Sequence, residues 1–329
     1  MTIARPRTLV AMSADVADRL LQAPVRSRLS TVADVDPGLV VTDFSQVDLT
    51  KVEVLFTSWG CPEVTAEVLD RAPALRAVVH AAGSVKHHLT DAVWQRGIAV
   101  SSAAAANAEP VAEFTLASIL FANKRVIDIA RAYREERRTG DWDRLYPGFG
   151  NYRKTVGVVG ASRIGRRVIE LLRPFDLDVL VSDPYLRDDL GVPTVGLDEL
   201  VERSDVVSLH APDLPETRHL IDVRRLARMR DGATLINTAR AALVDQDALT
   251  RELLSGRLYA VLDHTEPEFL PAGSPLYDLP NVLVTPHIAG SLGGELARMA
   301  DLAVDELARH ARGLAFEYAV EPASLSRSA

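Results

Sequence analysis

Three side chains that could together bind and protonate a substrate, Arg240, Glu268 and His287, each follow a short apolar run in the last third of the chain. A guanidinium carries a permanent charge on a planar fork that orients a carboxylate. An imidazole, with an ordinary pKa of about 6.5, donates and recovers a proton near neutral pH. A carboxylate bonded to its other ring nitrogen fixes the ring and favours the charged form. The three residues therefore suit the reduction of a carbonyl group beside a carboxylate.

Each of these residues also has a plainer interpretation. Taken alone, Arg240 could be a surface ion-pair partner, Glu268 a loop carboxylate and His287 a structural histidine. All three residues occur in the chain after a nucleotide-binding pattern, and this combination favours the catalytic interpretation. Glu266 remains an alternative to Glu268 because it lies only two residues earlier.

The nucleotide-binding pattern lies in residues 155–185, which read as strand, turn, helix and strand. Gly160, Ser162 and Gly165 have the spacing of Gly-x-Gly-x-x-Gly, with serine in the second place. The N–H groups of a helix N-terminus bind pyrophosphate, and the Ser162 hydroxyl could either bond that group or crowd it. Asp183 follows Gly165 by 18 residues, which suits a carboxylate that bonds the ribose and repels a 2′-phosphate. The pattern predicts NAD rather than NADP.

Further motifs follow the nucleotide-binding pattern. They are LHAP (209–212) with ETR (216–218), LINTARAALVDQDAL (235–249), LDHTEPEFL (262–270) and TPHIAGS (285–291). With them the sequence resembles the NAD-dependent D-2-hydroxyacid dehydrogenases, which include phosphoglycerate dehydrogenase and glyoxylate reductase. The resemblance covers residues 54–291. It implies D-stereospecific hydride transfer between NAD(H) and C2 of a small 2-hydroxy or 2-oxo acid, with Arg240, Glu268 and His287 as the catalytic residues.

The resemblance also implies which residues surround the cofactor and the substrate. On the substrate side it indicates two loops, 57–62 with Trp59 and 81–86 with the backbone N–H groups of Gly83 and Ser84, together with Arg240. Asp263 would lie near the nicotinamide, although a strand-end cap is the plainer interpretation. The expected NAD contacts are Gly160, Ser162, Arg163, Ile164, Gly165, Asp183, His210, Pro212, Thr217, Thr238, Ala239, Asp263 and Gly290.

Some positions depart from the family's usual pattern. Ala241 and Ala242 replace paired glycines, Phe269 replaces a proline, His264 replaces a valine, and Val85 stands where Gly or Asn is common. Loop 57–62 has no cation where phosphoglycerate-type members carry arginines, so a phosphorylated substrate would lack a partner there. We expect instead an uncharged substrate side chain, which can be bulky, near Trp59. Trp59 could equally be a packing residue.

No metal site is expected. His80, His87 and His88 have no acidic or cysteine ligands at convincing spacing, so they are interpreted as surface histidines. Cys61, the single cysteine, cannot form an internal disulfide and is expected to be a packing residue rather than a nucleophile.

The elements that position these residues alternate between short apolar runs and amphipathic stretches, which predicts parallel strands joined by crossover helices. The fold class is α/β, with two doubly wound parallel sheets. A long helix over 110–138 is expected to connect two domains. Strands are expected at 8–12, 39–42, 52–57, 75–80 and 98–101, and then at 155–159, 178–182, 205–209, 233–237, 259–263 and 281–285.

The last helix, expected over 292–312, has no strand to follow. We therefore expect it to return to the first domain. A Rossmann NAD-binding domain, 105–291, would then be inserted into a smaller flavodoxin-like substrate domain, 1–104 and 292–329.

The charge balance, 37 Lys and Arg against 45 Asp and Glu, gives a net charge of −8 and argues against nucleic acid or an anionic membrane as a main partner. The arginines at 224, 225, 228 and 230 are interpreted as a solvated helix face. Apolar runs are too short for a secretory or membrane segment, so a cytoplasmic location is expected. The resemblance implies a homodimer formed through residues 110–138. An alternative function is an NAD-sensing interaction protein, similar to a corepressor, which would bind NADH without turnover.

Overall fold

The computed structural model describes residues 5–325 and divides into two compact units. The first unit takes the chain up to Asn107 and again from Ser291, and the second unit is Ala108–Gly290. The second unit is therefore an insertion in the sequence of the first.

The sheet of the first unit has five parallel strands in the order β2-β1-β3-β4-β5. This 2-1-3-4-5 order is that of flavodoxin-like doubly wound sheets. The strands are β1 (Thr8–Ala11), β2 (Val40–Val41), β3 (Val54–Thr57), β4 (Ala77–His80) and β5 (Ala99–Ser102).

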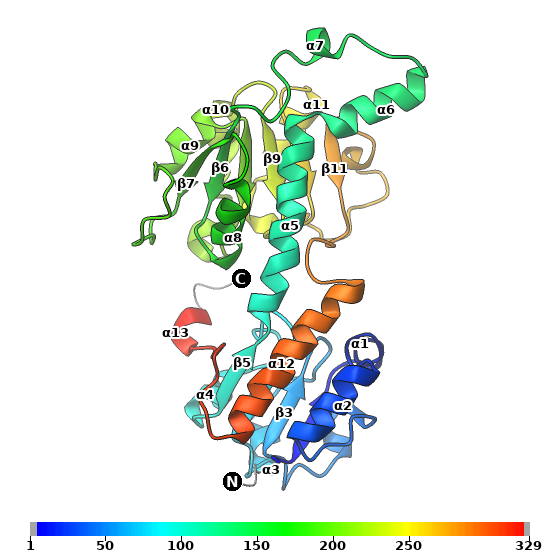
Figure 1. Cartoon of the computed structure of the whole chain (residues 1–329), viewed down its shortest axis with the longest axis vertical. Helices are drawn as coiled ribbons and strands as arrows, with labels where there is room; N and C mark the ends of the chain where they lie inside the picture. The colour runs from blue at the N-terminus through cyan, green and yellow to red at the C-terminus, as the bar shows by residue number, and fades with distance from the viewer. Residues whose placement is uncertain (1–4, 326–329) are drawn as a thin grey trace. The chain divides into compact units, whose positions relative to one another are not determined.

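Helices cover both faces of this sheet (Figure 1), which explains why its strands read as continuous apolar runs. One face packs α1 (Ala14–Leu20), α2 (Ala23–Val32) and α12 (Leu296–Ala311). The other face packs α3 (Ala66–Arg71) and α4 (Asp91–Gln95). The remaining elements are the short helices η1 (Phe44–Gln46), η5 (Gly293–Glu295) and α13 (Pro322–Leu325). The final long helix α12 thus belongs to the first unit, as expected.

The sheet of the second unit has six parallel strands in the order β11-β10-β9-β8-β6-β7. The chain direction across the sheet reverses between β6 and β8, and in doubly wound sheets ligands bind at such a switch point, beyond the carboxyl ends of the strands. The strands are β6 (Thr155–Val159), β7 (Asp178–Ser182), β8 (Val206–Leu209), β9 (Thr234–Asn237), β10 (Tyr259–Leu262) and β11 (Val282–Val284).

Two apolar clusters fill the faces of this second sheet. One includes α5 (Ala104–Asn123) and α8 (Arg163–Leu172), and the other includes α9 (Leu197–Arg203), α10 (Val223–Arg228) and α11 (Gln246–Leu254). Arginines of α10 pair with Asp198 and Glu202 of α9, in keeping with a solvated face. The other elements are α6 (Val126–Glu136), α7 (Trp142–Leu145), η2 (Pro215–Thr217), η3 (Ala241–Leu243) and η4 (Pro275–Tyr277).

Both sheets and all eleven strands agree with the α/β prediction, with strand ends displaced by two residues at most. The prediction of a single long helix over 110–138 is wrong, because the helix is interrupted there and the chain forms α5 and α6 instead (Figure 1). Arg125 adopts a left-handed backbone conformation at the break, with φ 53°. Its guanidinium donates to the Gly232 carbonyl and lies 3.7 Å from the ring centroid of Tyr259. Distant contacts therefore stabilise a break that the local sequence does not signal.

Among residues 5–325, no helix is both long and apolar enough to cross a membrane.

Candidate active site

Two glycines shape the turn that follows β6 at the switch point. Gly160 has φ 94°, and a β-carbon there would lie 2.8 Å from the Ala211 amide nitrogen. A β-carbon on Gly165 would lie 2.0 Å from the Gly160 carbonyl oxygen. Side chains are thus excluded at both positions, and the strand passes directly into α8. The N-terminus of α8, at the switch point, suits the pyrophosphate of a dinucleotide.

Ser162, the departure from the glycine pattern, is the N-cap of α8. Its hydroxyl accepts the Gly165 N–H at 3.4 Å. The serine therefore stabilises the helix start, which is a third role beside the two considered from the sequence. Arg163 and Ile164 begin the helix. Arg163 is exposed and forms no ion pair within residues 5–325, so its charge is available to a phosphate.

Asp183 follows β7 and lies beside the glycine turn. Its two carboxylate oxygens accept the N–H groups of Ala161 at 2.7 Å and Tyr185 at 2.8 Å. Because each oxygen has a second lone pair, the carboxylate can still accept bonds from ribose hydroxyls.

Apart from Asp263, which follows β10, the remaining expected cofactor residues lie in the loops after β8, β9 and β11. His210 is buried, and burial lowers its pKa to about 3, so the ring is neutral at physiological pH. Its Nε2 lies 2.8 Å from Ser208 Oγ, while its buried Nδ1 has no partner in the described part of the chain. The Thr217 hydroxyl donates to the Pro212 carbonyl at 2.7 Å.

Thr238 and Ala239 are buried, and Thr238 Oγ1 lies 2.9 Å from Thr115 Oγ1. Gly290 is the last residue of the second unit. The threonine hydroxyls at 217 and 238 thus hold the shapes of their loops, a role that the sequence did not indicate.

Arg240 is held by the loop that leaves β9. Asn237 Oδ1 accepts the Ala239 N–H at 3.1 Å, and Asn237 Nδ2 donates to the Arg240 carbonyl at 2.9 Å. Burial lowers the pKa of the Arg240 guanidinium, and the nearby charges of Asp213 and Glu268 oppose that shift. Sequence reasoning missed Asn237 and Asp213. An asparagine at a strand end, two residues before an N–H that it can bond, is the one signal available.

His287 and Glu268 form a hydrogen-bonded pair, with 2.9 Å between Nδ1 and Oε1. This bond is the main cause of a lowered Glu268 pKa. Glu266, the alternative, lies 3.5 Å from Arg218 instead. The geometry therefore joins Glu268, and not Glu266, to the imidazole.

Asp263 fixes the loop that carries His287. Its buried carboxylate accepts the Thr285 hydroxyl at 2.6 Å and the N–H groups of Ile288 and Ala289 at 2.8 and 2.9 Å. The His287 N–H donates to the Asp263 carbonyl at 3.1 Å, and His287 has φ 55°. These bonds support the strand-end cap for Asp263.

His264, which sequence analysis noted only as a departure, packs against the imidazole of His287. The two ring centroids lie 3.8 Å apart at a tilt of 55°. Burial, followed by the charges of His287 and Arg240, lowers the pKa of His264 to about 4. His264 is therefore a neutral ring at physiological pH.

The expected substrate residues of the first unit lie at the carboxyl ends of β3 and β4. Trp59 is 42% exposed, so it is not a fully packed core residue. Gly83 and Ser84 are half-buried, and the Ser84 hydroxyl accepts the Lys86 N–H at 3.4 Å.

Cys61 and the three nearby histidines were also interpreted from the sequence. Burial raises the pKa of the Cys61 thiol to about 12, which suits a packing residue. The interpretation of His80 and His88 as surface residues is wrong, since both are buried at the end of the sheet, and only His87 is exposed. Among the described residues, no group of three His, Cys, Asp or Glu side chains could hold a metal.

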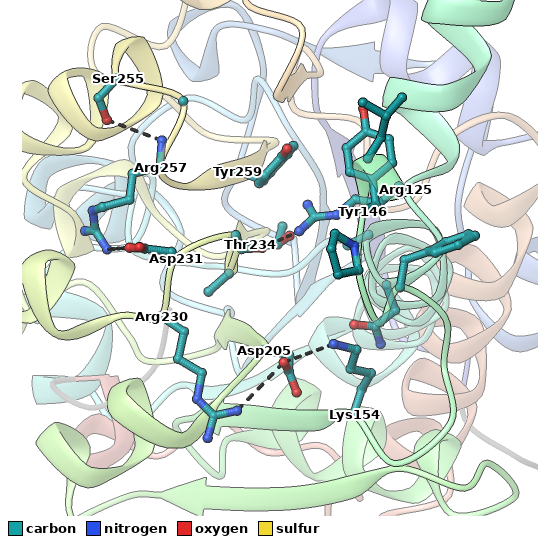
Figure 2. A pocket seen from close by; sticks show the side chains of 18 residues that line it. Arg125, Tyr146, Lys154, Asp205, Arg230, Asp231, Thr234, Ser255, Arg257 and Tyr259 are labelled. Carbon is teal, nitrogen blue, oxygen red and sulfur yellow. Dashed lines mark hydrogen bonds and ion pairs between the residues drawn. The ribbon is translucent and has the colours of Figure 1, made fainter. Parts of the chain in front are cut away.

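A cavity of about 470 Å³ lies at the opposite, amino-terminal edge of the second sheet (Figure 2). Three basic side chains that line it already lie close to carboxylates. Lys154 lies 3.2 Å from Asp205, Arg230 lies 3.8 Å from the same carboxylate, and Arg257 lies 3.4 Å from Asp231. None of the expected catalytic or cofactor residues lines it. The cavity is therefore separate from the candidate active site.

Comparison with known families adds the decisive observation. The pattern described as "D-isomer specific 2-hydroxyacid dehydrogenase, NAD binding domain" matches residues 116–289, more than half of the chain. The chain belongs to this family. The dehydrogenase is thus an NAD-dependent oxidoreductase, in agreement with the resemblance and with the glycine turn of the second unit.

Several relatives are similar over most of the dehydrogenase. A glyoxylate reductase of Korarchaeum cryptofilum is 36% identical over 76% of this chain and 77% of that enzyme. A D-3-phosphoglycerate dehydrogenase of Mycobacterium tuberculosis is 33% identical over 93% of this chain, which spans only 54% of that enzyme. A solved D-lactate dehydrogenase of Aquifex aeolicus, complexed with NAD and lactic acid, is 30% identical, with a TM-score of 0.71 over 93% of this chain and 96% of that one.

Proposed function

We propose that this dehydrogenase reduces a small, unphosphorylated 2-oxo acid to the D-2-hydroxy acid, and catalyses the reverse oxidation, with Arg240, Glu268 and His287 as its catalytic residues. The observation that carries the proposal is the 2.9 Å pair of Glu268 and His287, in the same unit as a glycine turn that fits a dinucleotide. NADH, when bound, supplies the hydride for C2 of the substrate.

The catalytic residues have separate tasks in this proposal. The fixed charge of Arg240 binds the carboxylate and carbonyl oxygens of the substrate and so orients C2. His287 gives a proton from Nε2 to the carbonyl oxygen as that oxygen becomes negative. Glu268, bonded to Nδ1, holds the ring in position and stabilises the imidazolium from which that proton comes. In the oxidation direction the same nitrogen takes the proton back.

In this proposal, different residues of the second unit bind different parts of the dinucleotide. The N-terminus of α8, with Gly160, Ser162, Arg163, Ile164 and Gly165, would hold the pyrophosphate, and Asp183 would accept the ribose hydroxyls. The other expected contacts, from the loops after β8, β9, β10 and β11, would surround the nicotinamide half.

The substrate side chain is proposed to be uncharged. Loop 57–62 holds no Lys or Arg that could pair with a phosphate, and it offers the half-exposed Trp59 instead. The backbone N–H groups near Gly83 and Ser84 would bind the substrate carboxylate. The relatives named above include enzymes for glyoxylate and for phosphoglycerate, so the distinction needs a direct test.

The test is a panel of 2-oxo acids followed through NADH absorbance. We expect turnover of apolar 2-oxo acids with kcat/KM at least tenfold above that of 3-phosphohydroxypyruvate. A clear preference for the phosphorylated compound would contradict the substrate proposal. NADH binding without any turnover across the panel would instead revive the NAD-sensing alternative, which the relatives do not favour.

We further propose a cytoplasmic homodimer. The support for the dimer is α6, an amphipathic helix with no buried residue in the single chain, on which Tyr133 is 59% exposed. Light scattering at micromolar concentration tests the oligomeric state.

A further inference from the structure

Three polar side chains are buried together at the carboxyl edge of the first sheet. Thr57 ends β3 and His80 ends β4, and the two residues are partners in the strand ladder. Thr57 Oγ1 lies 2.9 Å from His80 Nδ1 and 3.3 Å from His88 Nε2, and the two rings lie 4.5 Å apart. Their exposed fractions are 0%, 2% and 4%, so the group is closed to water.

One hydroxyl can bond both rings at once. A hydroxyl has a single proton, so Thr57 donates to one ring and accepts from the other. His80 Nε2 is buried with no partner among residues 5–325. The Thr57 hydroxyl therefore joins the two rings through its two contacts.

Both rings are neutral at physiological pH. Burial, with a smaller effect of His87, lowers the pKa of His88 to about 4. Burial, followed by the charge of His88, lowers the pKa of His80 well below its ordinary value, and the Ser84 backbone partly opposes that shift. Neither ring therefore carries a charge that would disrupt its contact with Thr57 at neutral pH.

The group connects the two loops that the proposed function assigns to the substrate. Loop 57–62 starts at Thr57, while loop 81–86 lies between His80 and His88, so Thr57 holds both of its ends. The Ser58 hydroxyl adds a bond to the Ala81 carbonyl at 3.2 Å. A loop fixed at both ends keeps its backbone N–H groups aimed at one point.

We propose that Thr57, His80 and His88 are positioning residues that hold loop 81–86 and thereby set the affinity for the substrate carboxylate. The proposal rests on the proposed function, in which N–H groups of that loop bind this carboxylate. It assigns the three side chains no part in the proton transfer, which belongs to His287.

The test compares Thr57→Val, which removes the hydroxyl and nearly keeps the shape, with Thr57→Ser, which keeps the hydroxyl. Thr57→Val leaves a buried ring nitrogen unpaired, and we expect KM for the best 2-oxo acid of the panel to rise about tenfold. We expect kcat to stay within threefold and the Kd of NADH to stay unchanged. Thr57→Ser is expected to restore KM to within threefold of the wild type.

Thr8→Val is the matched control. Thr8 is a buried threonine on β1 of the same sheet, and its hydroxyl bonds the Pro6 carbonyl at 3.1 Å. An unchanged KM in Thr57→Val, or an equal rise in Thr8→Val, overturns the inference. If Thr57→Val does not fold, His88→Asn decides, with an expected KM rise of at least threefold at constant kcat, and an unchanged KM overturns the inference. A wild-type enzyme inactive on every 2-oxo acid would instead refute the proposed function.

Discussion

At the scale of single residues, the proposed proton transfer depends on the imidazole of His287. Replacing His287 by Ala removes the proposed donor, and we expect kcat for 2-oxo acid reduction to fall by roughly 10² to 10⁴. The NADH affinity should stay within threefold, because the glycine turn is untouched. Steady-state kinetics and a fluorescence titration with NADH measure the two effects. A kcat within tenfold of the wild type would remove His287 from the proposed mechanism.

Glu268 and Glu266 provide a matched pair, since they lie two residues apart and have different partners. Glu268→Gln removes the charge beside the imidazole, and we expect kcat to fall about tenfold or more. Glu266→Gln removes only an exposed ion pair with Arg218, which typically contributes little, so its kcat should stay within twofold. Equal losses in the two variants would contradict the role given to Glu268.

At the scale of elements, the turn between β6 and α8 tests the cofactor site. A β-carbon on Gly165 would meet the Gly160 carbonyl at 2.0 Å, so Gly165→Ala must displace the start of α8. We expect the Kd of NADH to rise at least tenfold. Gly196→Ala is the control, because a β-carbon at that helix N-cap meets nothing within 4 Å. Calorimetric titration of both variants with NADH checks the comparison, and similar affinities would contradict it.

The strands could be predicted from sequence because buried parallel strands require continuous Val, Ile and Leu runs. Local pattern could not locate the break between α5 and α6, because Arg125 is stabilised there by Gly232 and Tyr259, about a hundred residues away. Burial of His80 and His88 was missed for the same reason, since their partner Thr57 comes from a different strand. The pairing of His287 with a nearby glutamate was accessible from the motifs, whereas the choice of Glu268 over Glu266 required coordinates.

At the scale of the whole molecule, neutral histidines that are buried or half-buried predict sensitivity to acid. The pKa values of His88, His210 and His264 are lowered to about 4, 3 and 4, against about 6.5 in an unfolded chain. Below pH 6.5 the unfolded state therefore binds protons that the folded state does not. The contribution of each ring to the free energy of unfolding is fully present above pH 6.5. As the pH drops toward 4, that free energy falls by roughly 3 kcal/mol for each ring.

Urea unfolding at pH 7, 5.5 and 4.5 measures this loss. His264→Val, which places the family's usual residue at that position, should reduce the pH dependence of the unfolding free energy by about one proton in this range. An identical pH dependence in the variant and the wild type would show that His264 is not held neutral in the folded state.

Because the second unit is an insertion in the sequence of the first, the two segments of the first unit are synthesised at different times. Residues of α12, among them Met299 and Leu307, complete the apolar cluster that covers one face of the first sheet, and they leave the ribosome after the whole of Ala108–Gly290. The inserted unit can thus fold while the earlier segment still exposes Val10, Leu20 and Phe56 to solvent. The first unit therefore cannot complete its apolar core before α12 is synthesised, and apolar surface that stays exposed until then favours aggregation.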